Sequence, residues 1–405
     1  MSGGRECRES TAAPRRALLL SCLLLSALLG TVHAFSLFLE PLEARFEASR
    51  SEISLTYSFA LIALTLGVLL GHRLYRAFPA PGLVLLICTL AAGGTALAGA
   101  APTLAILWLG YSLLFGFANG LGYGFVLHVA GQSSGGREGT AMGLATAFYA
   151  AGAAAAPPLV GPLLAAGGGA GGFGTAMLLL AAALLCAGVT AAAALRRAGF
   201  VFLREERGGQ PGAAATAQAD GARRATVPLL WLGYGSAVTA GLMAIGHATG
   251  IARAAGLDDA AVLAAPTAIA LANMAGGFAG GLLLDRVATP RLLAALPALA
   301  LAALLVLALL PEAATALPGL AVVGFAYGAI IAAYPAAIVR RFGAGAAVRI
   351  YGYVFTAWGL AGFLGPWLGG LAFDASGSYG WALALAAALA LLSTLVVLAG
   401  RRRLA

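Results

Sequence analysis

Polar residues divide the chain into long apolar runs that are separated by short charged segments. A helix needs about 20 apolar residues to cross a bilayer core about 30 Å thick, because it rises about 1.5 Å per residue. The apolar runs have this length and are built mainly from Ala, Leu and Gly. We therefore predict twelve transmembrane helices, near residues 17–39, 54–72, 82–101, 103–127, 140–165, 173–195, 228–251, 260–284, 292–310, 317–339, 350–373 and 379–400.

The composition agrees with this interpretation. Of the 405 residues, 61% are hydrophobic and only 10% are charged, and the mean hydropathy is +0.93. A soluble domain of this length could not bury so much apolar surface, since its surface area does not shrink fast enough with size. The predicted fold class is an all-α membrane protein, with the lipid bilayer as its main surroundings.

The basic residues indicate an orientation in the membrane. All 24 are arginines, and if the N-terminus is cytoplasmic, 21 of them fall in cytoplasmic segments and three, Arg45, Arg50 and Arg253, fall outside. This asymmetry follows the positive-inside rule. We expect a multi-pass protein of the cell (inner or plasma) membrane with both termini in the cytoplasm. The net charge of +9 is spread over short segments between apolar runs, which argues against a nucleic-acid partner.

The N-terminal stretch PRRALLLSCLLLSALLGTVHA has the basic head and apolar middle of a secretory signal peptide. The apolar run continues through Phe35 and Leu39, so it reaches a full spanning length. We therefore expect an uncleaved first helix.

Motifs for metal binding or catalysis are not found in the sequence. The four cysteines, Cys7, Cys22, Cys88 and Cys186, have no CxxC spacing, so neither a disulfide framework nor a metal site is indicated. No phosphate-binding loop, HExxH motif or Ser/His/Asp set is present. We expect no cofactor and no enzymatic activity.

The chain contains an internal repeat at an offset of 204 residues. At this offset GLGYGFVLHV (120–129) aligns with GFAYGAIIAA (324–333), and the Gly-Pro pair at 161–162 aligns with the pair at 365–366. The repeat predicts two homologous, pseudo-symmetric bundles of six helices. The expected parts are a cytoplasmic tail at 1–16, a bundle at 17–195, a flexible cytoplasmic linker at 196–227, a second bundle at 228–400 and a tail at 401–405.

The stretch GGLLLDRVATPR (280–291) carries a more specific signal. It resembles the G-x-x-x-D-R signature, followed by a later basic residue, of the major facilitator superfamily. The resemblance implies the twelve-helix major facilitator fold and a gating role for Asp285, Arg286 and Arg291, whose contacts at the helix ends would bias one of two packings. The alternative is that these charges only fix the end of a helix. The first-half counterpart departs from the pattern, since Gly71 stands where the aspartate belongs.

A narrower resemblance covers most of the chain. Residues 30–59 and the ending GGLAFDASGSYGWALAL (369–385) are similar to the oxalate:formate antiporter and monocarboxylate porter families. These families exchange small carboxylates, or co-transport them with protons, by alternating access. Gly277 and Trp358 stand where members commonly carry basic residues. A carboxylate without a counter-charge is costly to desolvate, so a dicarboxylate such as oxalate is not expected.

The candidate substrate-binding residues are polar groups deep in the predicted helices. His33 could carry a coupling proton or donate to the solute, while the tyrosines offer a ring and a hydroxyl donor. Each also has a structural alternative, such as a packed histidine, an interfacial aromatic or an amide bonded between helices. The set comprises His33, Tyr123, Tyr149, Asn273, Tyr327 and Trp358.

Taken together, these features predict a secondary active transporter, which we expect to be monomeric. The solute would be a small organic acid, monocarboxylate-like, moved by proton symport or by exchange. One alternative is efflux of amphiphilic, drug-like solutes by the same fold, and another is a non-transporting sensor derived from a transporter.

Overall fold

The computed structural model describes residues 3–133, 138–202 and 213–404. Contacts between residues divide the chain into two compact units. The first comprises residues 1–32, 44–46 and 59–204, and the second comprises 33–43, 47–58 and 205–405. The boundary in the middle of the chain falls between residues 204 and 205, but two short segments of the first half pack with the second unit.

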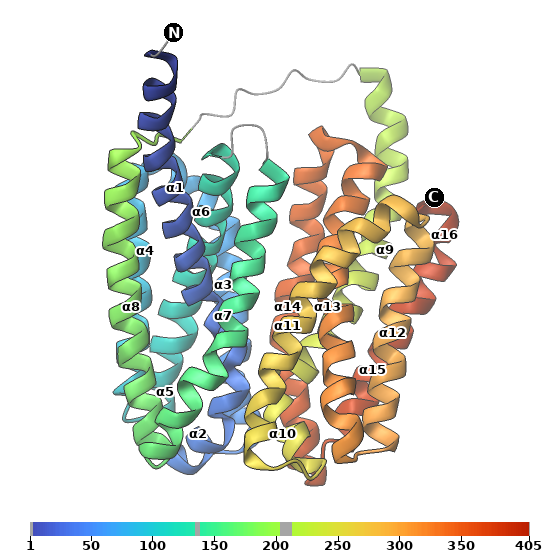
Figure 1. Cartoon of the computed structure of the whole chain (residues 1–405). Helices are drawn as coiled ribbons and strands as arrows, with labels where there is room; N and C mark the ends of the chain where they lie inside the picture. The colour runs from blue at the N-terminus through green and yellow to red at the C-terminus, as the bar shows by residue number, and fades with distance from the viewer. Residues whose placement is uncertain (1–2, 134–137, 203–212, 405) are drawn as a thin grey trace. The chain divides into compact units, whose positions relative to one another are not determined.

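The first half of the chain consists of helices joined by short turns (Figure 1). They are α1 (Gly3–Gly30), the 3-10 helix η1 (Thr31–Phe38), α2 (Leu39–Phe46), α3 (Arg50–Ala77), α4 (Ala80–Gly99), α5 (Leu104–Leu107), the π-helix η2 (Trp108–Phe115), α6 (Gly116–Ser133), α7 (Glu138–Ala166) and α8 (Ala170–Arg197).

The second half has the same character. Its helices are α9 (Ala213–Gly246), α10 (Ala248–Ala254), α11 (Asp259–Arg286), α12 (Thr289–Leu309), α13 (Ala313–Phe342), α14 (Ala344–Ser376), α15 (Gly380–Ala399) and α16 (Arg401–Leu404).

The prediction of twelve membrane-spanning helices is confirmed. Within the described residues, twelve helical segments are long and apolar enough to cross a membrane. The first of them extends from Ala17 to Phe46, beyond the predicted end at residue 39, because η1 and α2 continue it through residues with charged side chains. Leu39 and Leu42 of α2 are buried, which explains why this amphipathic end remains helical.

The segment predicted as a flexible linker, 196–227, is partly helical. Helix α8 ends at Arg197, and α9 already begins at Ala213. Residues 213–227 are rich in alanine, the residue with the highest helix propensity, so this part continues into the following membrane helix. Residues 203–212 lie outside the described part of the chain.

Glycines bring pairs of helices into direct backbone contact, as expected where lipid supplies no hydrophobic drive for association. A Cβ atom added at Gly276 of α11 would lie 2.0 Å from the carbonyl oxygen of Phe325 in α13, and one at Gly280 would lie 2.5 Å from that of Ala329. In the first unit, a Cβ atom at Gly120 of α6 would lie 1.8 Å from the carbonyl oxygen of Leu64 in α3. Only small residues permit such packing.

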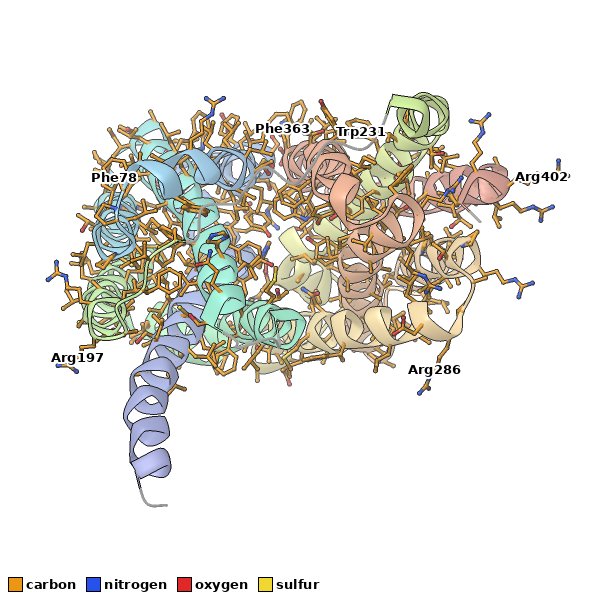
Figure 2. The ribbon with its side chains drawn as sticks, turned by 90° about the horizontal axis from the view of Figure 1, so that it is seen from above. Phe78, Arg197, Trp231, Arg286, Phe363 and Arg402 are labelled. Atoms are coloured by element: carbon orange, nitrogen blue, oxygen red, sulfur yellow. The ribbon has the colours of Figure 1, made fainter. Side chains whose placement is uncertain are left out.

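Large apolar side chains also lie on the outside of the helices. Leu159, Leu309 and Trp381 are between 69% and 74% exposed. Such exposure is expected of a surface that contacts lipid tails, and it would be unfavourable in water. By contrast, Arg197, Arg286 and Arg402 point away from the helices in Figure 2 and lie at helix ends.

Candidate functional site

Two of the predicted site residues meet in the first unit. The rings of Tyr123 (α6) and Tyr149 (α7) are 4.9 Å apart between centroids. The Tyr149 hydroxyl donates to Oδ1 of Asn119 at 2.8 Å, and Nδ2 of Asn119 donates to the carbonyl of Leu29 in α1 at 2.6 Å. Asn119 is fully buried, and its amide orients the Tyr149 hydroxyl. This network joins α1, α6 and α7 through neutral groups.

Two further predicted residues meet in the second unit. Nε1 of Trp358 (α14) donates to the hydroxyl of Tyr327 (α13) at 3.0 Å, and both side chains are buried. Phe355 stacks on Trp358, with centroids 5.5 Å apart and an interplanar angle of 4°. A phenol that accepts a hydrogen bond becomes a stronger donor, because neighbouring hydrogen bonds polarise one another. The indole N–H is used in this bond, so the pair offers aromatic faces and a polarised hydroxyl with no formal charge.

His33 lies in η1, which packs with the second unit. Its Nδ1 is 2.6 Å from the hydroxyl of Tyr57 in α3, and Tyr57 in turn stacks on Phe35 with centroids 5.5 Å apart. An imidazole held by a phenol in this way is oriented by it and can exchange a proton. The tyrosine was not among the predicted residues, although it lies 24 residues after His33 in the stretch that carries the family resemblance.

Asn273 lies at the contact between α11 and α13. A Cβ atom at Gly328 would lie 2.4 Å from its Oδ1, so the amide rests against the backbone of the opposite helix. Gly277, one turn further on, faces the same region, and a Cβ atom there would be 3.9 Å from the carbonyl oxygen of Gly328. The site therefore has room at the position where the resembled families carry a basic residue.

Sequence reasoning did not single out two further aromatic residues of the second unit. Tyr234 of α9 is fully buried, and its ring is 4.7 Å from that of Tyr334 in α13. Helix α9 approaches closely as well, since a Cβ atom at Gly241 would lie 2.7 Å from the ring of Tyr327. In the sequence, Tyr234 lies among glycines in residues 233–241. The same pattern is typical of ordinary packed membrane helices, so it did not point to a site.

The predicted gating residues lie at the C-terminal end of α11 and just beyond it. The Asp285 carboxylate is 4.0 Å from Nη1 of Arg340 near the end of α13, and the Asp285 side chain is 82% exposed. Arg340 also donates to the carbonyl of Leu284. Arg286 and Arg291 are exposed. The aspartate thus contacts a neighbouring helix end, as the motif implies, and its partner is an arginine that the prediction did not include.

The corresponding end of α3 in the first unit is built differently. Gly71 occupies the aspartate position, and the Tyr75 hydroxyl fills the adjacent space and donates to the carbonyl of Leu121 at 3.0 Å. The Tyr75 ring stacks on His128 and on Phe202, at centroid distances of 5.7 and 5.6 Å. Burial raises the pKa of the Tyr75 phenol, so it remains a neutral donor. An aromatic cluster therefore replaces the ion pair.

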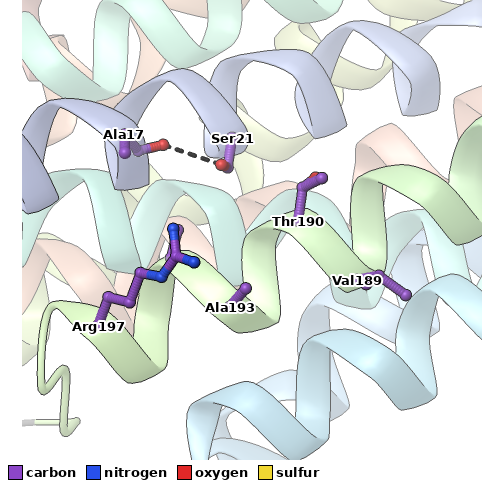
Figure 3. A pocket seen from close by; sticks show the side chains of 7 residues that line it. Ala17, Ser21, Val189, Thr190, Ala193 and Arg197 are labelled. Carbon is purple, nitrogen blue, oxygen red and sulfur yellow. Dashed lines mark hydrogen bonds between the residues drawn. The ribbon is translucent and has the colours of Figure 1, made fainter.

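A groove between α1 and α8 is distinct from these residues (Figure 3). It has a volume of about 400 Å³ and is lined by small side chains, with Arg197 at one end. Ser21 and Thr190 bond to carbonyls of their own helices, at 2.8 Å from Ala17 and 3.0 Å from Cys186. Because its hydroxyls are already satisfied and none of the predicted residues lines it, the groove is not assigned to the solute.

Comparisons with known proteins identify the fold and the family. The family model described as Major Facilitator Superfamily matches residues 19–366. The uncharacterized MFS-type transporter YhjX of Escherichia coli (strain K12) is 24% identical over 336 residues, which is 82% of each chain.

Solved structures of transporters have the same fold. A bacterial homologue of the human lysosomal transporter Spinster superimposes with a TM-score of 0.71 at 16% identity, covering 96% of this chain and 95% of the other. A mutant of the nucleoside transporter NupG gives a TM-score of 0.73 at 14% identity, covering 95% and 99%. At these identities the likeness concerns the fold alone. The family match, which spans most of the helices described above, shows that this multi-pass chain is a transporter and not an enzyme, and that it belongs to the major facilitator superfamily.

Proposed function

We propose that the protein is a secondary active transporter of a small organic acid, monocarboxylate-like, which it moves by proton symport or exchange. The observation that carries this proposal is the neutral pair of Trp358 and Tyr327, joined by a hydrogen bond of 3.0 Å and buried in the second unit. In this pair the indole N–H is bonded to Tyr327, so the phenol hydroxyl and the aromatic faces are the groups that would contact a carboxylate or its protonated acid, without a full counter-charge. They suit a monoanion better than a dianion.

The proton would be carried by His33. Its contact with Tyr57 gives the imidazole a fixed partner with which it can exchange a proton. In this proposal Tyr123, Tyr149 and Asn273 supply further polar contacts to the solute, and Asp285 with Arg286 and Arg291 acts in gating. The arginine distribution supports a cell-membrane location with cytoplasmic termini. We further propose that the protein acts as a monomer.

Uptake into proteoliposomes tests this function. The panel contains labelled formate, lactate, pyruvate and oxalate, with and without a pH gradient, together with a nucleoside and a cationic amphiphile. We expect uptake of a monocarboxylate that rises with an inward proton gradient, or exchange against the same acid. Uptake of the amphiphile alone would favour the efflux alternative, and no flux for any solute would favour a sensor.

Two tryptophans provide a matched pair of variants. Trp358→Phe removes the donor to Tyr327, and we expect at least a tenfold loss of uptake. Trp231→Phe removes an indole N–H that also donates to a hydroxyl, that of Thr356 at 2.9 Å, but at an exposed position. We expect this control to remain within twofold of the parent. Equal effects of the two variants would contradict the assignment of the site.

A further inference from the structure

The groove between α1 and α8 lies within the first unit, at the ends of two membrane-spanning segments (Figure 3). One segment begins at Ala17 and the other ends at Arg197, and both residues line the groove. At 1.5 Å per residue, its α8 side from Val189 to Arg197 is about 12 Å long. One leaflet of the hydrocarbon core is about 15 Å thick. The groove therefore extends through most of a single leaflet and ends at the membrane surface.

The groove forms because short side chains face each other across it. Ala17 and Ser21 of α1 are one turn apart, and Ala193 of α8 lies on the opposite wall. The glycines of α8 make their close contact elsewhere, since a Cβ atom at Gly188 would lie 2.6 Å from Cβ of Cys88 in α4. Helix α8 is thus packed tightly against α4, while its side toward α1 leaves about 400 Å³ unfilled.

The walls of the groove suit a hydrocarbon chain. The hydroxyls of Ser21 and Thr190 donate to carbonyl groups of their own helices, so neither needs a polar occupant. Val189 in the groove is 61% exposed, and Leu20 beside it on α1 is 65% exposed. Exposed apolar side chains of this size are expected where a helix faces lipid tails. The occupant that fits these walls is an acyl chain.

One end of the groove carries a positive charge. Arg197 is an exposed residue in the last turn of α8, and Figure 3 shows its side chain reaching toward α1. Within the described ranges no carboxylate pairs with it, whereas Arg50, Arg253 and Arg340 each pair with one. A guanidinium can donate to two phosphate oxygens at once. Basic residues between membrane helices at the cytoplasmic surface are typical of sites for lipid headgroups.

We propose that the groove binds one anionic phospholipid of the cytoplasmic leaflet, with an acyl chain between α1 and α8 and its phosphate on Arg197. The excess of arginine at this end of the predicted membrane helices favours that leaflet. A zwitterionic lipid carries its own ammonium group close to the phosphate, so its attraction to Arg197 is weaker. Because the lipid contacts both helices of the folded protein, it stabilises the packing of α1 on α8.

Native mass spectrometry of the purified full chain tests this site. The protein is equilibrated in detergent with equal amounts of phosphatidylglycerol and phosphatidylcholine that have the same acyl chains. We expect the parent to retain one phosphatidylglycerol at least fivefold more often than phosphatidylcholine, and Arg197→Gln to reduce this preference to within twofold. Arg196→Gln is the matched control, because Arg196 is exposed in the same turn but does not line the groove. It should keep the preference.

A second pair of variants tests the apolar part of the groove. Ala193→Trp places a large ring between α1 and α8, and retention of phosphatidylglycerol should fall at least fivefold. Leu178→Trp adds a ring to the same helix at a position that is 56% exposed and lies outside the groove, so retention should stay within twofold of the parent. If Ala193→Trp does not fold, the two arginine variants alone decide the proposal.

Three outcomes would overturn the proposal. The parent could retain both lipids equally, or Arg197→Gln and Arg196→Gln could lose the preference to the same extent, in which case no phosphate site exists at Arg197. A dimer mass that Ala193→Trp abolishes would make a second copy of the chain the occupant. None of these measurements needs a transported solute, so a failure here is distinguishable from a failure of the proposed function.

Discussion

Two sets of charged residues in the second unit differ sharply in their surroundings. Around Arg50, a guanidinium that is 8% exposed pairs with both oxygens of Glu43. At the far end of α11, Asp285 is 82% exposed and only 4.0 Å from Arg340. Isolated exposed ion pairs contribute about 0–1 kcal/mol, whereas breaking a buried pair costs about 3–5 kcal/mol. The buried set is therefore the one on which the structure depends, and the exposed pair can open at little cost.

The close backbone contact beside Arg50 gives the largest expected difference between the two places. Gly370→Val would place a Cβ atom 2.7 Å from Cα of Ser51, and a backbone atom cannot move aside as a side chain can. We expect a loss of about 3 kcal/mol or more in the free energy of unfolding. Gly281→Val, next to the Asp285 end, is the control, because no atom lies within 4 Å of its added Cβ. Thermal unfolding in detergent measures both, and similar midpoints would contradict the contrast.

The general fold could be predicted from the sequence better than these interactions could. Long apolar runs determine the number of helices, because lipid leaves the backbone no other way to satisfy its hydrogen bonds. The pair of Tyr327 and Trp358 consists of two predicted residues: Tyr327 lies in the internal repeat, and Trp358 stands where the resembled families commonly carry a basic residue. The bonds that link Arg50 to Asp374 and onward to His247 were missed, because these residues are far apart in sequence and each alone resembles a residue at a membrane surface.

For Asp285 the motif could be predicted from the sequence, but its contacts could not. Its residue pattern is recognisable from a short stretch, but the pattern does not indicate how strongly the aspartate is paired or that its partner is Arg340. In the first unit the aspartate is replaced by Gly71, and nothing in the local sequence indicated that Tyr75 would occupy the space. Such replacements depend on packing between helices, which local sequence does not encode.

The pH dependence of stability should distinguish the buried set from the exposed pair, because His247 is linked to Arg50 through the Tyr379 hydroxyl. The pKa of His247 is lowered by burial to about 4, below the value of about 6.5 expected in the unfolded chain. The unfolded state therefore binds a proton between these values while the folded state does not, so stability is full above pH 6.5 and falls as the pH drops toward 4.

The expected loss from this one residue is roughly 2 kcal/mol between pH 7 and pH 5. His247→Gln retains a donor for the carbonyl of Pro366 but does not titrate, so its unfolding free energy should depend less on pH by this amount. Chemical unfolding at the two pH values measures the difference. An unchanged slope in the variant would show that His247 is protonated or accessible in the folded protein.

The smallest expected effects compare the two aspartates directly. Asp374→Asn weakens two hydrogen bonds to the start of α3, and we expect a loss of about 1 kcal/mol, as for other helix caps. Asp285→Asn removes only a long, exposed ion pair, and we expect a loss below about 0.5 kcal/mol that disappears in high salt. If gating is the role of Asp285, this variant should still change the transport rate, because a contact that opens in each cycle affects the balance between two states more than the stability of either. A loss of stability as large as that of Asp374→Asn would instead make Asp285 a structural residue, and the distinction between the two charged sets would no longer hold.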